Sequence, residues 1–281
     1  MLGNVRPLTG HIGAEIAGID LKAIGVGEAE AIHQAFLDHQ VLFFPRQTMA
    51  PDDLVAFGSR FGEIDPPHGG LRHLADHPDV MLVETRAGAG GGKYNAIWHS
   101  DVTFDPTPPL GSILYAVKLP DVGGDTLFAS MYAAYDALSE RMRNMVEGLE
   151  ALHDGIPDFR PYLLDPTTPD GPERLRKLKQ QHPGCVHPVV RRHPKTGRKA
   201  LFVNRAFTVD IMGVNRIESR NILNFLFEHI EQPTFQVRWH WNQGDVAMWD
   251  NRCALHYASM DYGDAHRVLH RVTLKGDRPA A

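Results

Sequence analysis

Residues His99, Ser100 and Asp101 place an imidazole and a carboxylate two positions apart, a combination that can hold a divalent metal ion. With 16 His and 34 Asp and Glu among 281 residues, about two His-x-acid triplets are expected by chance. The chain has three. The triplet therefore predicts little by itself, and its surroundings must distinguish the three cases.

Only one triplet lies where both side chains can converge on one ion. His229 and Glu231 fall in an expected helix, where residues two apart point about 200° away from each other. His77 and Asp79 are expected to be a solvated surface pair. The remaining triplet lies in the stretch 97–104, IWHSDVTF, which we expect to be a strand. Residues i and i+2 of a strand share one face roughly 6.5–7 Å apart. A hydrogen bond between the histidine and the aspartate, without metal, is the alternative.

A site with two histidines and one carboxylate needs a second histidine from a distant strand. Four candidates lie near the C-terminus: His240, His256, His266 and His270. In the strand expected at 267–274, Arg267 and Arg271 point to one face. Arginines on an otherwise apolar face are costly unless each meets an anion. A solvent-exposed basic face is the alternative.

Short strands are the elements that would position these residues. Strand-like runs occur at 41–45, 112–117, 126–130, 199–204, 235–241, 245–251 and 267–274. Helical periodicity occurs at 27–39, 51–62, 131–153 (with Ser130 as its cap) and 217–230. Because regular helices do not separate the strands, the pattern favours an antiparallel sandwich or jelly roll with helices outside, in one domain over 1–281. The Pro- and Asp-rich segment 154–173 is expected to be a loop that acts as a lid, and 86–95 is a glycine-rich loop.

The composition excludes several classes of protein. The hydrophobic fraction of 43% and the charged fraction of 22% are ordinary for a globular protein. A net charge of −5 gives no sign of a nucleic-acid or membrane surface. No signal peptide or bilayer-spanning run is visible. Cys185 and Cys253 lie far apart and predict free thiols in a reducing compartment. We therefore expect a cytoplasmic protein without nucleic-acid or membrane partners.

Five motifs in a fixed order carry a family resemblance: WHSDVTF, GGDTLF, AMWDN, LHYA and HRVLHRVTL. Together they resemble the iron(II)- and 2-oxoglutarate-dependent dioxygenases of the taurine dioxygenase (TauD/TfdA-like) family. The similarity runs from PLTGHIGAEIAGIDL near the N-terminus to RVTLKGDRP near the end. It implies a double-stranded β-helix, a jelly roll, which is mainly β with flanking helices.

The resemblance also implies roles for individual residues. It assigns iron(II) to His99, Asp101 and His256, and the far carboxylate of 2-oxoglutarate to Thr126 and Arg267. The substrate would be bound by Asn95, Val102, Phe104, Phe207 and Arg271, with Arg271 holding its anionic group. The chain departs from the family after FGE, where taurine enzymes carry a substrate-binding His and Tyr. Here Pro67 takes the histidine's place, His68 follows, and no tyrosine is present.

The predicted activity is hydroxylation of a small organic anion with iron(II), 2-oxoglutarate and O2. A sulfonate such as taurine would yield succinate, CO2, sulfite and an aldehyde. A sulfate ester or an aryloxyalkanoate is the alternative within the family. A zinc-dependent hydrolase and a non-catalytic jelly-roll binding protein are alternatives of other classes. We also expect a homo-oligomer, a dimer or tetramer.

Overall fold

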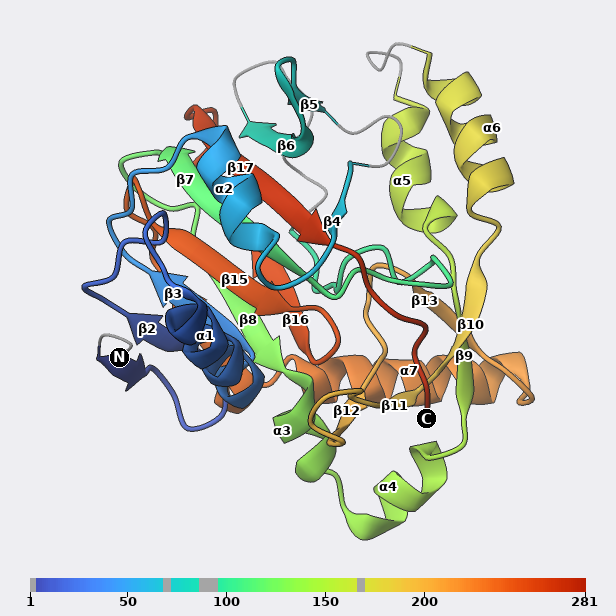
Figure 1. Cartoon of the computed structure of the whole chain (residues 1–281). Helices are drawn as coiled ribbons and strands as arrows, with labels where there is room; N and C mark the ends of the chain where they lie inside the picture. Colours follow the sequence, from blue (N-terminus) through green and yellow to red (C-terminus); the bar gives the residue numbers. More distant parts are fainter. Residues whose placement is uncertain (1–3, 68–71, 86–95, 166–169) are drawn as a thin grey trace.

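The computed structural model describes residues 4–67, 72–85, 96–165 and 170–281. One large sheet runs through the centre of the molecule (Figure 1), with the strand order β1-β2-β3-β15-β7-β17-β6-β5 and with β4 paired to β17. Its strands are β1 (Val5–Pro7), β2 (Ala14–Ile16), β3 (Val41–Phe44), β4 (Ile64–Asp65), β5 (His73–Leu74), β6 (His77–Thr85), β7 (Gly111–Lys118), β15 (Val246–Asp250) and β17 (Arg267–Leu274). All its pairs are antiparallel except β2 with β3.

Three smaller sheets complete the strands of the described segments. The first has the order β14-β8-β16 and consists of β14 (Gln236–Trp239), β8 (Thr126–Ser130) and β16 (Ala254–Ala258). The second has the order β10-β9-β13, with β10 (Cys185–Pro188), β9 (Glu150–His153) and β13 (Thr208–Ile211). The third pairs β11 (Val190–Arg192) with β12 (Lys199–Leu201).

The large sheet and the β14-β8-β16 sheet pack face to face and enclose an apolar core. Phe43 of β3, Phe128 of β8, Val237 of β14 and Trp249 of β15 belong to one buried cluster. The ring of Phe43 lies 5.7 Å from Phe128 and stacks at 4.2 Å on Trp239. Side chains from two antiparallel sheets that interdigitate in this way form a β-sandwich. The predicted jelly roll is therefore confirmed.

Strand β15 is buried on both faces because helices cover the outer face of the large sheet. Ala247 and Trp249 point into the sandwich core. Val246 and Met248 point the other way, into a second cluster beneath helices α1 (Val26–His39) and α2 (Pro51–Gly58), which lie over the sheet in Figure 1. Burial of both faces explains why the strand has no polar alternation.

The remaining helices are α3 (Met131–Asp136), α4 (Glu140–Val146), α5 (Ile156–Leu163), α6 (Gly171–Gln181), α7 (Arg216–Ile230) and the 3-10 turn η2 (Pro233–Phe235). The prediction of one long helix over 131–153 is wrong, because α3, α4 and β9 occupy this range. Ser130 caps α3, as expected, by accepting from the Ala133 amide. Ser139 then caps a second helix, and Gly148, at φ 85°, turns the chain into β9.

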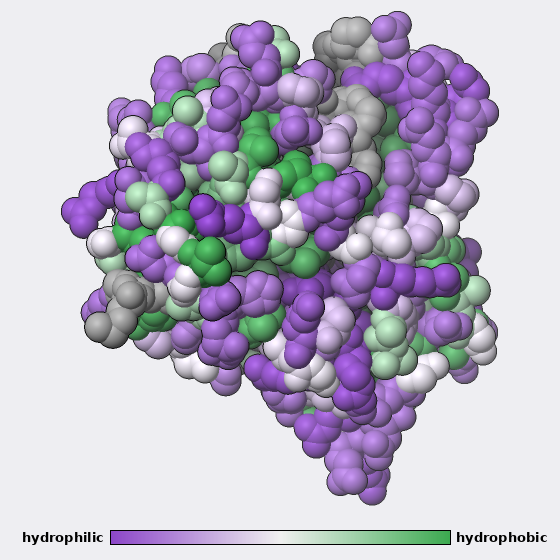
Figure 2. Space-filling view, in the orientation of Figure 1, coloured by the Kyte–Doolittle hydropathy of each residue, from purple (hydrophilic) through white to green (hydrophobic). Residues whose placement is uncertain are grey.

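The segment 154–173 is not an irregular loop, because it contains α5 and the start of α6. Its role as a lid stays a prediction. On the face shown in Figure 2, hydrophilic residues cover the projecting regions of α4 and α6. No helix within the described ranges is both long and apolar enough to cross a membrane. The glycine-rich stretch 86–95 lies outside the described residues.

Candidate active site

His99 and His256 are held side by side by the backbone. The His99 amide donates to the His256 carbonyl at 3.0 Å, and the His256 amide donates back at 2.8 Å, so the two residues form an isolated antiparallel bridge. The prediction of a strand over 97–104 is wrong, because the chain turns immediately after this bridge. Val102 adopts φ 52° in that turn. This conformation costs a β-branched residue roughly 1–3 kcal/mol, and it accompanies the reversal of the chain next to Asp101.

Three donor atoms converge at this point. The Asp101 Oδ1 atom lies 4.0 Å from His99 Nε2 and 3.7 Å from His256 Nε2. These distances are too long for hydrogen bonds, yet the donor set lies within 4.8 Å, which suits three ligands of one ion. His99 Nδ1–H donates to the Ile97 carbonyl at 2.7 Å, so its Nε2 keeps a free lone pair.

Burial and charge give these groups the protonation states of metal ligands. Burial lowers the pKa of His99 and lowers that of His256 well below its ordinary value, so both imidazoles are neutral. Burial alone would raise the pKa of Asp101, but Arg271 and the two histidines outweigh it and hold that pKa low. Two neutral imidazoles and one carboxylate form the facial set that a divalent non-haem metal binds. The donor set therefore fits such an ion.

His193, Asp250 and Cys253 form the other His/Cys/acid cluster of the described chain, and its imidazole and carboxylate are already hydrogen-bonded. The amides of residues 195 and 196 donate to His193 Nδ1, so the Nε2–H of this ring donates to Asp250 at 3.0 Å. The Arg252 guanidinium donates two hydrogen bonds to the same carboxylate, at 2.8 and 2.7 Å. Burial raises the pKa of the Cys253 thiol. This cluster is a hydrogen-bonded part of the core.

Arg267 is a buried cation without a carboxylate partner in the described segments. The residue is 5% exposed, and its side chain donates one hydrogen bond, to the Gly124 carbonyl at 3.2 Å. Its Nε atom has no partner, and burial lowers the pKa of the guanidinium. A buried guanidinium in this state favours binding of an anion. The hydroxyl of Thr126 accepts from Trp241 Nε1 at 2.9 Å, which leaves its hydrogen free to donate. The donor chemistry fits a carboxylate co-substrate.

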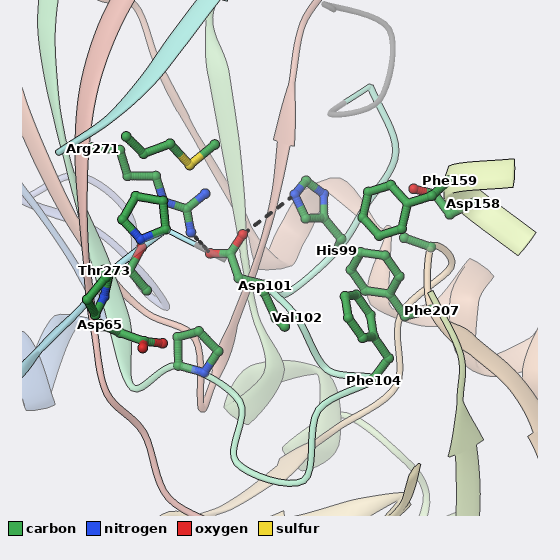
Figure 3. Close-up of a pocket in the computed structure, with 15 residues that line it drawn as sticks. Asp65, His99, Asp101, Val102, Phe104, Asp158, Phe159, Phe207, Arg271 and Thr273 are labelled. Carbon is green, nitrogen blue, oxygen red and sulfur yellow. Dashed lines mark ion pairs between the residues drawn. The ribbon is translucent and has the colours of Figure 1, made fainter. Parts of the chain in front are cut away.

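A cavity of about 130 Å³ opens beside His99 and Asp101. Val102, Phe104 and Phe207, which the sequence predicted as pocket walls, line it together with Phe159. The Phe104 ring lies 5.0 Å from Phe207 and 5.9 Å from Phe159. Figure 3 shows Arg271 on one side of Asp101 and this aromatic group on the other.

Arg271 makes a contact that sequence reasoning missed. Its Nη2 atom lies 2.6 Å from Asp101 Oδ2 and donates to Ser112 Oγ at 2.7 Å. Ser112 is fully buried in β7, and no spacing rule pointed to it. Asn251 was also missed as a functional residue, although it lies in the AMWDN motif: its side-chain oxygen accepts from Trp249 Nε1 at 3.0 Å, and its carbonyl accepts from Ser100 at 2.7 Å.

The other sequence candidates lie elsewhere. His240 contacts Asp125 at 2.8 Å, and His266 contacts Glu84 at 3.0 Å, so neither joins the donor set. His270 is half-buried on β17 and is not a member of the cluster. Asn95 and His68 lie outside the described residues.

Comparisons with known proteins agree over almost the whole chain. A family model described as "Taurine catabolism dioxygenase TauD, TfdA family" matches residues 4–273. An alkylsulfatase of Acinetobacter baylyi is 37% identical over 97% of this chain and 85% of its own length. An alpha-ketoglutarate-dependent sulfate ester dioxygenase of Pseudomonas putida is 37% identical over 98% of this chain and 90% of its own. The crystal structure of a taurine dioxygenase from Burkholderia xenovorans superposes with a TM-score of 0.82 at 36% identity, covering 99% of this chain and 92% of that one.

Proposed function

Because this chain belongs to the TauD/TfdA family and is a 2-oxoglutarate-dependent dioxygenase, we propose that it hydroxylates a small organic sulfonate or sulfate ester with an apolar tail. Membership of the family sets aside the zinc hydrolase and the non-catalytic binding protein. His99, Asp101 and His256 would hold iron(II), and Arg267 and Thr126 would hold the far carboxylate of 2-oxoglutarate. The bound metal, co-substrate and oxygen supply the oxidising power for C–H hydroxylation, with conversion of 2-oxoglutarate to succinate and CO2.

The position of Arg271 supports an anionic substrate more than any other observation. Its guanidinium lines the same cavity as His99 and Asp101. A planar guanidinium binds a sulfonate, sulfate or carboxylate through two parallel hydrogen bonds. Asp158 lines the cavity on the aromatic side, away from Arg271 in Figure 3, and burial raises its pKa to about 6. Near pH 7 this carboxyl is largely ionised and repels anions, so the anionic group is directed toward Arg271.

An apolar tail fits the walls of this cavity. Pro66 and Pro67 line it in the loop where taurine enzymes carry polar substrate ligands. With the phenylalanines opposite, they offer the tail no hydrogen bonds. This arrangement favours an alkyl sulfate or alkanesulfonate over taurine. The substrate test therefore also includes taurine, which was predicted from the sequence, and an aryloxyalkanoate.

The residues of the site would position the substrate carbon that carries the sulfonate sulfur or the sulfate-ester oxygen. Arg271 would fix the anion beside the metal ligands, and the apolar walls would exclude water around the tail. Hydroxylation replaces one C–H bond on that carbon by C–OH. The product then loses the hydroxyl proton and breaks its C–S bond, or its C–O bond in a sulfate ester. An aldehyde and sulfite, or an aldehyde and sulfate, are released.

Oxygen uptake tests this proposal. Iron(II) and 2-oxoglutarate are supplied with ethyl sulfate, hexyl sulfate, ethanesulfonate, taurine or phenoxyacetate, and sulfite, sulfate or phenol is measured with succinate. Uptake coupled to sulfate or sulfite release supports the proposal. Coupling only with phenoxyacetate would show that the substrate is a carboxylate, and no coupling with any compound would reject the anionic pocket.

Two variants separate the roles of the two arginines. Arg271→Ala should raise the KM for the organic substrate far more than the KM for 2-oxoglutarate, whereas Arg267→Leu should do the reverse. Equal losses in both constants for both variants would contradict the assignment. The predicted dimer or tetramer is tested on the same preparations by sedimentation.

A further inference from the structure

The two oxygens of Asp101 face different groups. Oδ1 points toward the histidine nitrogens, 4.0 Å from His99 Nε2 and 3.7 Å from His256 Nε2. Oδ2 lies 2.6 Å from Arg271 Nη2 and 3.4 Å from Ser112 Oγ. One carboxylate thus joins the metal-binding donor set to the guanidinium that lines the substrate cavity (Figure 3).

Ser112 fixes this connection. A hydroxyl can accept and donate at the same time, and Ser112 Oγ accepts from Arg271 at 2.7 Å while it lies within reach of Asp101 at 3.4 Å. These are its side-chain hydrogen bonds in the described part of the chain, and its exposed fraction is 0%. In the sheet, Ser112 lies opposite Trp249 on one side and Thr273 on the other. Because Ser112 is buried between two neighbouring strands, its side chain stays in place when Arg271 or Asp101 shifts.

Without a substrate anion, Asp101 is the ion-pair partner of Arg271 in the described residues. The guanidinium Nε has no hydrogen-bond partner, so the group retains donor capacity. The positive charge of Arg271 attracts the Asp101 carboxylate, which is a ligand that the metal needs. The same charge repels the metal ion. An anion that binds to Arg271 would neutralise this charge while Ser112 keeps Asp101 in place.

We propose that Ser112, Asp101 and Arg271 form a coupling element through which a substrate anion and the metal ion strengthen each other's binding. Ser112 acts as a positioning residue in this element. The inference rests on the proposed function, since it requires an anion at Arg271. Binding linkage is reciprocal, so the anion must tighten the metal by the same factor as the metal tightens the anion.

Calorimetry with manganese(II) tests the coupling without turnover. Manganese(II) is titrated into the metal-free full-length protein in the presence of ethyl sulfate or ethanesulfonate, or of sodium chloride at the same ionic strength. The expected result is a manganese Kd that is lower by roughly tenfold with the organic anion. Titration of the anion, with and without manganese, should give the same factor.

Three variants test the residues. Ser112→Ala should reduce the coupling to about twofold or less while thermal melting stays cooperative. Arg271→Gln should abolish it and provides a second test if Ser112→Ala does not fold. Ser219→Ala is the matched control, because Ser219 is a buried serine on α7 that contacts Asp210, and it should keep the wild-type factor.

The outcomes distinguish this inference from the proposed function. Binding of the anion without any change in metal affinity overturns the coupling and leaves the function in place. Full coupling in Ser112→Ala overturns the role of Ser112. Failure of both anions to bind overturns the anion site at Arg271, and with it both proposals.

Discussion

Replacing Arg267 by leucine should affect the ligand-free protein and the binding of 2-oxoglutarate in opposite ways. Arg267 is 5% exposed, and its guanidinium makes one hydrogen bond to Gly124 and leaves its Nε atom without a partner. Because a buried charge without a counter-ion is costly, an apolar side chain of similar size should leave the free energy of unfolding within about 1 kcal/mol of wild type, or raise it.

The loss of co-substrate binding should be large. Truncating one partner of a buried, hydrogen-bonded charge pair costs about 2–5 kcal/mol, and about 3 kcal/mol weakens the Kd roughly 150-fold. At a 2-oxoglutarate concentration of about 100 times the wild-type Kd, the wild type gains about 2.7 kcal/mol and the variant only about 0.3 kcal/mol. At about 2 °C per kcal/mol, the rise in Tm is about 5 °C for the wild type and below about 1 °C for the variant.

Differential scanning calorimetry with manganese(II), with and without 2-oxoglutarate, measures both quantities. Arg252→Leu is the contrasting variant, because Arg252 is buried against Asp250 with two contacts of 2.8 and 2.7 Å. Its removal leaves the buried Asp250 carboxylate without its arginine partner and should cost about 3–5 kcal/mol. The reasoning is refuted if Arg267→Leu is destabilised as strongly as Arg252→Leu and still shows the wild-type response to 2-oxoglutarate.

Two further predictions concern stability. Burial, and to a smaller extent His187, lower the pKa of His153 from 6.5 to about 3, so the folded protein cannot take the proton that the unfolded chain binds. Stability should fall as the pH drops from about 6.5 toward 3, by about 2 kcal/mol at pH 5 from this residue. Urea melts at pH 7.5 and 5 should show this loss reduced in His153→Asn; an unchanged loss contradicts the assignment. In Gly111→Ala, the added Cβ would lie 2.4 Å from the Trp249 carbonyl oxygen, so thermal melts should report a loss of roughly 1–3 kcal/mol. Gly27→Ala, with nothing within 4 Å, is its control, and equal Tm values for the two variants would contradict the predicted clash.

Much of the architecture was predictable because local pattern and tertiary environment agree. The helices over 27–39 and 217–230 appear as α1 and α7, and the strand over 267–274 appears as β17. Each has a strong periodicity or a clear cap. The prediction of one long helix over 131–153 is wrong because Ser139 caps a new helix and Gly148 turns the chain into β9. The apolar residues nevertheless continue at helical spacing through these breaks.

The candidate site was found by its residues but not by its geometry. His99 and Asp101 converge because of a turn with a left-handed Val102, not because they share a strand face. Side-chain spacing cannot reveal such a turn, since a β-branched residue at positive φ is disfavoured locally and is stable only when the surroundings impose it.

The sequence by itself determined the types of donor groups, the order of the motifs and the jelly-roll class. Only the tertiary structure decided which atoms meet. Ser112 and Arg271 come within 2.7 Å across 159 residues of chain, because β7 and β17 pair with Arg271 opposite Leu114 and Thr273 opposite Ser112. That register follows from the burial of Val272 and Leu274 on one face of β17 and of Leu269 on the other, a property of the packed molecule that no single segment encodes.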